Sequence, residues 1–230
     1  MFEAFKKLKL ASAFLGHSHE GRPGQSFSLR DVLGDLSERE LESFGGEIDD
    51  LMSQPGVGQL YENRYLPPPE SLDVLLDLPR DTLGYSFGIY LKRHRLKIAP
   101  APADFDFSDR LAYIRERVRM THALLHVVTG YDASTLGELA VQAYIVGQTN
   151  NLVSGTIIAT GLITMIRDEP ARLGDALQVM AEANERGRQA RSFLGVPWEE
   201  FWTAPLDEIR DMAGIPRRTS EGARLDLDRL

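Results

Sequence analysis

The sequence predicts an all-α fold built from many helices, and three observations support this prediction. Apolar residues recur at the three- and four-residue spacing of amphipathic helices along most of the chain, whereas the alternation typical of strands is scarce. Helix start signals are clear, as in the capping box formed by Ser37 and Glu40. Hydrophobic residues make up 43% of the 230 residues and charged residues 26%, which is enough apolar material for a core without disulfides.

The composition also restricts the chemistry that the chain can perform. There is no cysteine, so disulfides, thiolate zinc sites and cysteine nucleophiles are excluded, and any metal must be held by nitrogen and oxygen ligands. The formal net charge of -8 argues against nucleic-acid binding, because neutralising phosphates requires a basic face. A local cationic pocket for one anionic head group is compatible with this charge.

The N-terminal part of the chain is expected to be helical. Residues 1–16 follow an amphipathic pattern and lack the long apolar run of a signal peptide; the polar side carries Lys6, Lys7 and Lys9. Such a helix packs on its own domain or on a partner, or it rests on a membrane surface. With the helix opened by Ser37, we expect residues 1–59 to form a helical segment packed on the same domain as the rest.

Proline-rich stretches divide the next part of the chain. Tyr65-Leu-Pro-Pro-Pro-Glu70 is a rigid break, after which a short helix over 72–76 is expected. Another helix begins at Asp81 and runs out in the basic run Lys92-Arg-His-Arg95. This run is either a solvated helix end or, near a membrane, a contact for anionic lipid. Further prolines then enforce an extended linker.

The strongest helical pattern covers residues 110–129, with Ser108 or Asp109 as its cap and Gly130 as its stop. One apolar stripe runs along this helix; it consists of Leu111, Ile114, Val118, Leu125 and Val128. The second half is apolar almost all round, so we expect this end to be buried.

The last third of the sequence predicts three more helices. The first runs from Thr135 to about Ile166, with polar residues at 148–151 that mark a kink or an exposed turn. A second helix starts at Pro170 and closes at Gly195, and a short one lies between Pro205 and Gly214; residues 217–230 read as a loose polar tail. No segment reaches the roughly 18 to 20 apolar residues that span a bilayer.

Two histidines and one glutamate form the candidate metal site. His122 and His126 are four residues apart, so on a helix they point the same way. Glu138 follows across a short turn, which usually makes two helices antiparallel neighbours. Two imidazoles and one carboxylate leave coordination positions open, as catalytic zinc and non-heme iron sites require. Spacing alone leaves an alternative, in which Thr135 and Glu138 form a capping box and the histidines are hydrogen-bonded core residues.

The residues around this site resemble a known family. His122-Ala-Leu-Leu-His126, Gly130 and Glu138 are similar to the motif His-Asp-x-x-His, glycine and glutamate of the fourth coenzyme Q (ubiquinone) biosynthesis protein family. Other blocks agree in the same order: Leu78-Pro-Arg-Asp-Thr-Leu-Gly84, 112–122, Leu136-Gly-Glu-Leu-Ala140, Gly187-Arg-Gln-Ala190, 198–206 and Gly214-Ile-Pro216. The resemblance covers roughly residues 60–216, which we take as the core domain, followed by the tail at 217–230.

The resemblance implies a single-domain, all-α, homodimeric protein of ubiquinone biosynthesis. It implies a cytoplasmic protein associated peripherally with the inner face of a membrane, with other quinone-biosynthesis proteins as partners. The family's activity is oxidative decarboxylation at ring carbon one of a prenylated hydroxybenzoate; a non-catalytic isoprenoid-binding or scaffold role is the alternative, so whether the chain is an enzyme stays open. A helical protein unrelated to quinones is the third interpretation. The ligand set suits a divalent metal, with zinc as first candidate and iron, magnesium or manganese as alternatives.

The family also binds a long isoprenoid tail in an apolar groove near the metal motif. By its residues alone, the helix after Glu138 is an ordinary core helix or one wall of such a groove. The resemblance favours the groove. The candidate groove residues are Ile145, Leu152, Ile158 and Leu162.

One position departs from the family pattern. The aspartate that follows the first histidine of the motif is Ala123 here, and an aspartate there would be a fourth ligand or would orient an imidazole. Its loss predicts weaker metal binding and a divalent site with a net charge of about +1. Such a site favours an anionic ligand. Arg115 and Arg119, on the same helix, either bind that anion or are solvated surface charges.

Overall fold

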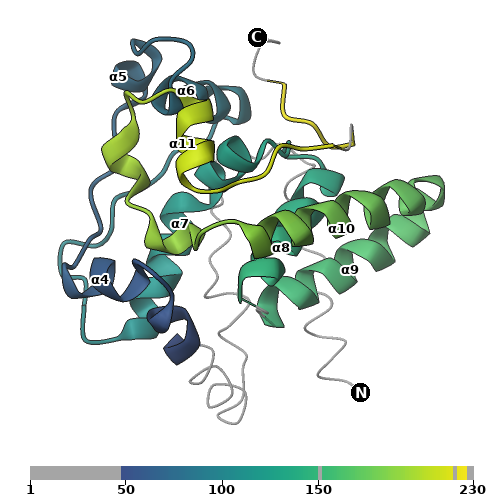
Figure 1. Ribbon diagram of the computed structural model, residues 1–230, viewed down its shortest axis with the longest axis horizontal. Helices are drawn as coiled ribbons and strands as arrows, with labels where there is room; N and C mark the ends of the chain where they lie inside the picture. Colours follow the sequence, from purple (N-terminus) through teal and green to yellow (C-terminus); the bar gives the residue numbers. More distant parts are fainter. Residues whose placement is uncertain (1–47, 150–151, 220–221, 227–230) are drawn as a thin grey trace. The chain divides into compact units, whose positions relative to one another are not determined.

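The computed structural model describes residues 48–149, 152–219 and 222–226 (Figure 1). Every regular element in these ranges is a helix, and the extended pairings are two isolated antiparallel bridges, Thr82–Pro205 and Tyr131–Arg224. The all-α prediction is therefore confirmed. The expected helix over 1–16 lies outside the described residues, as does the start of the helix that Ser37 opens; residues 48–53 of the latter are helical. No described helix combines the length and apolar character needed to cross a bilayer.

The described chain forms two compact units. The first contains residues 48–128 and 191–215, and the second contains 129–149, 152–190, 216–219 and 222–226. The predicted domain boundaries after residues 59 and 216 stay predictions.

The first unit is built from short helices around the long helix α7. Its elements are α4 (Val57–Glu62), α5 (Leu72–Leu76), α6 (Leu83–His94), α7 (Arg110–Thr129), the 3-10 turns Phe193–Gly195 and Trp198–Phe201, and α11 (Leu206–Met212). The last residue of α7, Thr129, belongs to the second unit. Polar caps begin three of these helices: the side chains of Ser71, Thr82 and Asp109 accept the backbone N–H groups of Val74, Tyr85 and Ala112. The expected cap Asp109 is thus confirmed.

A buried ion pair lies inside the first unit. The guanidinium of Arg117 donates to a carboxylate oxygen of Glu199 at 2.6 Å and to the carbonyl oxygen of Val196 at 3.1 Å. The Arg117 side chain is 1% exposed and that of Glu199 12%. The charge of Arg117 therefore fixes the segment after residue 191 against the first half of α7.

The second unit consists mainly of three helices that pack side by side in Figure 1: α8 (Thr135–Thr149), α9 (Leu152–Asp168) and α10 (Leu173–Gln189). The chain expected to form one helix from Thr135 to about Ile166 is described as α8 up to Thr149 and α9 from Leu152; residues 150–151 lie outside the described residues, so a single helix stays a prediction. The next helix differs from expectation, since a 3-10 turn over Pro170–Arg172 precedes α10, and α10 ends at Gln189 instead of Gly195.

Two glycines allow α8 and α10 to approach closely. A methyl group at Gly187 would overlap the carbonyl oxygen of Tyr144, and one at Gly147 would overlap that of Asn184. We expect Gly187→Ala to destabilise the protein by about 1–3 kcal/mol, because the added carbon forces two backbones apart. Thermal unfolding followed by far-ultraviolet circular dichroism measures this change.

The matched control for this prediction is Gly174→Ala on the same helix, where an added methyl group meets no atom within 4 Å. This control should be neutral or stabilise the protein by up to about 1 kcal/mol, since alanine favours helix. Equal effects of the two substitutions would contradict the close approach.

The C-terminal residues are held in place in the second unit. Arg218 donates to the carbonyl oxygen of Gly130 at 2.7 Å, and the backbone N–H groups of Asp132 and Leu225 donate to Ala223 and Gly130 at 2.9 Å. The expected loose tail is therefore wrong for residues 217–219 and 222–226. These residues clasp the turn between α7 and α8, and we call them the C-terminal clasp. The sequence pattern missed the clasp because it depends on backbone pairing across about 90 residues, which leaves no local signal.

Candidate metal centre

The end of α7 is fixed by a glycine and by an arginine from a distant part of the chain. Gly130 has a φ of 76°, the left-handed conformation that ends helices and that glycine adopts without strain. Arg210 of α11 donates to the carbonyl oxygens of Val127 and Val128, each at 3.0 Å. These are carbonyls that a helix end leaves without helical partners, so Arg210 supports the turn of α7 that carries His126.

The start of α8 has its cap one residue earlier than the sequence suggested. The hydroxyl of Ser134 accepts the backbone N–H of Gly137 at 3.2 Å, and Asp132 in turn accepts from the backbone and the hydroxyl of Ser134. The third helical position is therefore Gly137, which has no side chain to complete a capping box. Glu138 is thus not the capping-box glutamate of the alternative interpretation, although it lies in the first turn, where the helix dipole favours a carboxylate.

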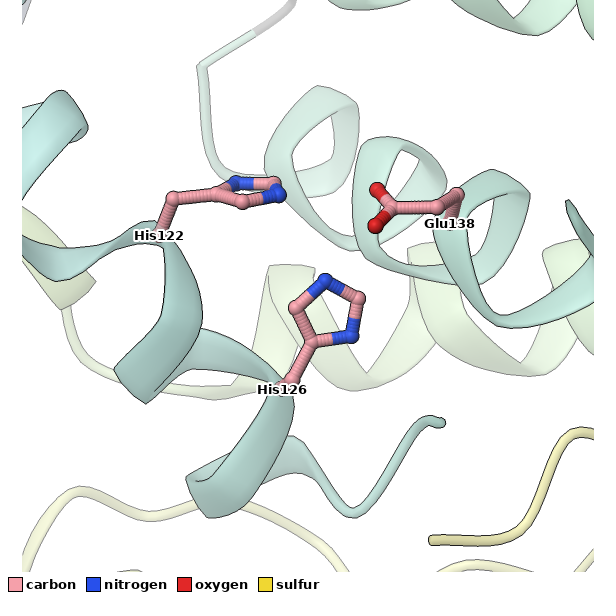
Figure 2. A group of neighbouring side chains, drawn as sticks. All are labelled: His122, His126 and Glu138. Atoms are coloured by element: carbon pink, nitrogen blue, oxygen red, sulfur yellow. The ribbon is translucent and has the colours of Figure 1, made fainter. Parts of the chain in front are cut away.

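The three predicted ligands come together. One ligand atom from each of His122, His126 and Glu138 lies within 4.8 Å of the other two, and Figure 2 shows both rings and the carboxylate pointing toward one another. The two imidazole centroids are 5.1 Å apart with their planes at 86°. His126 is fully buried and Glu138 is 6% exposed, whereas His122 is half-buried. The group is therefore closed on the His126 side and more accessible at His122.

An aromatic contact orients the buried imidazole. The ring of Tyr90 on α6 stacks on that of His126, with centroids 5.5 Å apart and an interplanar angle of 19°. Neither Tyr90 nor Arg210 was singled out in the sequence. A stack of this kind leaves no spacing signal, because the two residues are 36 positions apart.

The donor set fits a divalent metal. A tetrahedral zinc ion, with ligands at about 2.0–2.2 Å, spaces its ligand atoms by about 3.4 Å, so separations within 4.8 Å close through small side-chain rotations. Three protein ligands leave a position for a further ligand. Two neutral imidazoles and one carboxylate carry a charge of about -1, so a divalent ion would leave the site cationic. Ala123, half-buried on α7, supplies no carboxylate to offset this.

The candidate anion-binding arginines lie near the ligands on α7 but differ in their contacts. Arg119 donates to both carboxylate oxygens of Glu116, at 3.0 and 2.5 Å, and to the carbonyl oxygen of Ala99 at 2.7 Å. Arg115 is half-buried. An anion at Arg119 must compete with Glu116, and the role of both arginines stays a prediction.

The candidate groove residues lie on two separate helices. Ile145 is half-buried on α8, and Ile158 and Leu162 are half-buried on α9. Leu152 begins α9, but its side chain lies outside the described residues. A groove along these residues stays a prediction.

The chain resembles known proteins over most of its length. It matches the family model "Coenzyme Q (ubiquinone) biosynthesis protein Coq4" over residues 49–218. The ubiquinone biosynthesis protein COQ4 homologs of Danio rerio and Homo sapiens, both named mitochondrial, are 32% and 29% identical over 141 and 181 residues. These alignments cover 60% and 73% of this chain but 51% and 63% of the relatives, so the chain spans about half to three fifths of their length.

A solved structure agrees with these relatives. The crystal structure of a Nostoc punctiforme protein provisionally assigned to ubiquinone biosynthesis has a TM-score of 0.73 and 26% identity, and covers 92% of this chain and 98% of that one. Four observations agree with one another: the motif blocks, the all-α fold, the convergence of the two histidines with the glutamate, and the family match over residues 49–218. The chain therefore belongs to the Coq4 family of coenzyme Q (ubiquinone) biosynthesis proteins.

Proposed function

We propose that this chain binds a prenylated quinone precursor beside a divalent metal ion held by His122, His126 and Glu138, and that it catalyses oxidative decarboxylation at ring carbon one, in which the carboxyl group leaves as carbon dioxide and an external two-electron oxidant is reduced. The observation that carries the proposal is the convergence of these three side chains within 4.8 Å. Ubiquinone biosynthesis is the setting that the family gives, and a prenylated hydroxybenzoate is the substrate that the family resemblance implies.

In this proposal each side chain has a separate role in holding the metal or orienting the substrate. His126 and Glu138 provide the buried side of the centre, with Tyr90 fixing the plane of the His126 ring. His122 lies on the more accessible side, from which a substrate carboxylate would approach the centre. A metal ion bound here supplies Lewis acidity toward that carboxylate. The cationic charge expected for the site favours an acid substrate over a neutral one.

An apolar helix face supports the lipid part of the proposal. Residues 139–166 contain no charged side chain, and α9 leaves Ile163 and Ile166 50% and 53% exposed. The buried side of the same helix carries Ser154 and Thr160. Apolar residues on the outer side of a helix fit an isoprenoid tail, a membrane surface or a second copy of the chain. We propose zinc as the metal, with peripheral membrane association and a homodimer as the working state.

A non-catalytic role is the second candidate function, and Ala123 is the observation that favours it. Without a carboxylate at this position, metal binding is weakened while the apolar surfaces persist. In that case the chain presents isoprenoid intermediates to other quinone-biosynthesis proteins. Turnover of substrate separates the two candidates.

The direct test analyses metal and lipid in one sample of purified protein. Elemental analysis should find about one equivalent of a divalent metal, and lipid extraction with mass spectrometry should find a co-purifying isoprenoid. A protein with the lipid but without metal supports the scaffold role. A protein with neither contradicts both candidates.

His126→Phe tests the metal in the cell. It keeps an aromatic ring against Tyr90 but removes both ring nitrogens, so we expect loss of bound metal without loss of fold. In a strain that lacks its own family member, this variant should fail to restore quinone production, measured by chromatography of extracted lipids. His94→Phe is the matched control, because His94 lies outside the ligand group. Full quinone production by the His126 variant would rule out the metal-dependent reaction.

A further inference from the structure

The first unit contains a pocket that the proposed function does not use. Its volume is about 490 Å³, within the range of about 300–1,000 Å³ typical of small-molecule sites. The inner wall is apolar: Phe87, Leu91, Met120 and Leu124 line it and are each at most 7% exposed. Trp202 completes this wall and stacks on Phe87 with ring planes 4° apart. A rigid aromatic and aliphatic wall of this kind suits an apolar chain.

The pocket lies on the opposite face of α7 from the metal ligands. Met120 and Leu124 each stand two residues from His122, and each residue turns an α-helix by about 100°. Two steps therefore place these wall residues about 200° around the helix from His122. A ligand in the pocket is separated from the metal centre by α7 itself.

The mouth of the pocket is cationic. Lys92, Arg95 and Lys97 line it and are all exposed. The helix dipole accounts for Lys92 in the last turn of α6, but Arg95 and Lys97 follow the helix. Two acids also line the pocket. Glu199 is compensated by Arg117 at 2.6 Å, and the exposed Glu70 accepts the backbone N–H of Ser71, so the mouth keeps an excess of positive charge.

The backbone turns sharply to bring these cations over the mouth. Arg95 has a φ of 53°, which non-glycine residues adopt at a cost, and the N–H of Leu96 donates back to the carbonyl oxygen of Leu91 at 2.9 Å. This turn carries Leu96 and Lys97 along the mouth. Leu96 and Leu72 line the pocket with 42% and 37% of their surfaces exposed, so apolar surface continues from the wall to the solvent edge.

We propose that this pocket is a second ligand site, which binds a single-chain amphiphile ending in a carboxylate. The hydrocarbon chain of this ligand lies against the wall formed by Phe87, Leu91 and Leu124, and its carboxylate contacts Arg95 and Lys97 at the mouth. Arginine donates two parallel hydrogen bonds to a carboxylate. Glu70 at the same mouth disfavours a dianion, which selects a carboxylate over a phosphate monoester. The site is independent of the proposed metal chemistry.

The test is a fluorescence titration of the full chain with 11-(dansylamino)undecanoic acid. We expect saturable binding, displaced by an unlabelled fatty acid and not by the corresponding alcohol. The double variant Arg95→Asn/Lys97→Gln should weaken binding by about tenfold or more through the lost charged hydrogen bonds. Asparagine is chosen because it tolerates the left-handed conformation at residue 95. Arg80→Gln, an exposed arginine of the same unit outside the pocket, should leave binding unchanged.

A second pair of variants tests where the hydrocarbon chain of the ligand binds. Leu72→Glu places an anion in the mouth and should weaken binding, whereas Val74→Glu changes an exposed residue of the same helix that does not line the pocket. Equal effects of these two substitutions, or equal affinity for the acid and the alcohol, overturn the proposal. His122→Ala should leave the affinity unchanged; loss of binding in that variant would assign the probe to the metal centre and overturn the second site.

Discussion

Replacing Ala123 with aspartate is expected to raise the affinity of the His122–His126–Glu138 centre for zinc by about 10- to 100-fold, because a carboxylate at this position orients an imidazole or becomes a ligand. The added negative charge also attracts the cation more strongly and makes a divalent centre neutral. Competition with a chromophoric chelator measures the affinity, and elemental analysis measures occupancy after purification.

Ala123→Asn is the control for charge. Asparagine has nearly the same shape as aspartate but no negative charge, so its effect on zinc affinity should be much smaller. If the aspartate and asparagine variants both keep the affinity of the unchanged protein, residue 123 does not explain a weak site. A large gain in affinity that restores no turnover would favour the scaffold role, since metal occupancy would then not limit the reaction.

Replacing Arg117 with methionine is expected to lower the free energy of unfolding of the first unit by about 3–5 kcal/mol, because it leaves the buried Glu199 carboxylate without its cation. Methionine fills much of the space of the arginine stem, so the lower free energy of unfolding results mainly from the unpaired charge of Glu199. Burial and the nearby Glu199 also raise the pKa of Tyr65, so its hydroxyl stays protonated and adds no second anion. Urea unfolding followed by tryptophan fluorescence measures the effect, because both tryptophans, Trp198 and Trp202, belong to this unit.

The double variant Arg117→Met/Glu199→Gln separates the charge from the packing. Removing both charges of a buried pair is often neutral, so the double variant should recover most of the stability that the single variant loses. A single variant that costs less than about 1 kcal/mol would show that water reaches Glu199 and that the pair does not hold the segment after residue 191 against α7.

The features that could be predicted from the sequence are those that follow from residue spacing along one helix or across one short turn. The stripe from Leu111 to Val128 predicted α7 to the residue, and the four-residue spacing of His122 and His126 predicted a shared face. Glu138 could be placed near them because a short turn limits where the next helix starts. These inferences need only helix geometry and a few residues of chain.

The features that could not be predicted depend on contacts between distant residues. Arg210 binds the carbonyl oxygens of Val127 and Val128 across more than 80 residues, and Tyr90 stacks on His126 from another helix. The run at Lys92–Arg95 was interpreted as a solvated helix end or a contact for anionic lipid; the pocket wall behind it combines residues of α6 and α7 with Trp202.

The C-terminal clasp has a practical consequence for protein engineering. Arg218 and the bridge between Tyr131 and Arg224 secure the turn whose two sides carry His126 and Glu138. Shortened versions cut after Pro216 discard these contacts and leave the turn that follows Gly130 less constrained. Expression versions designed for metal or substrate assays should therefore retain the chain through Asp226.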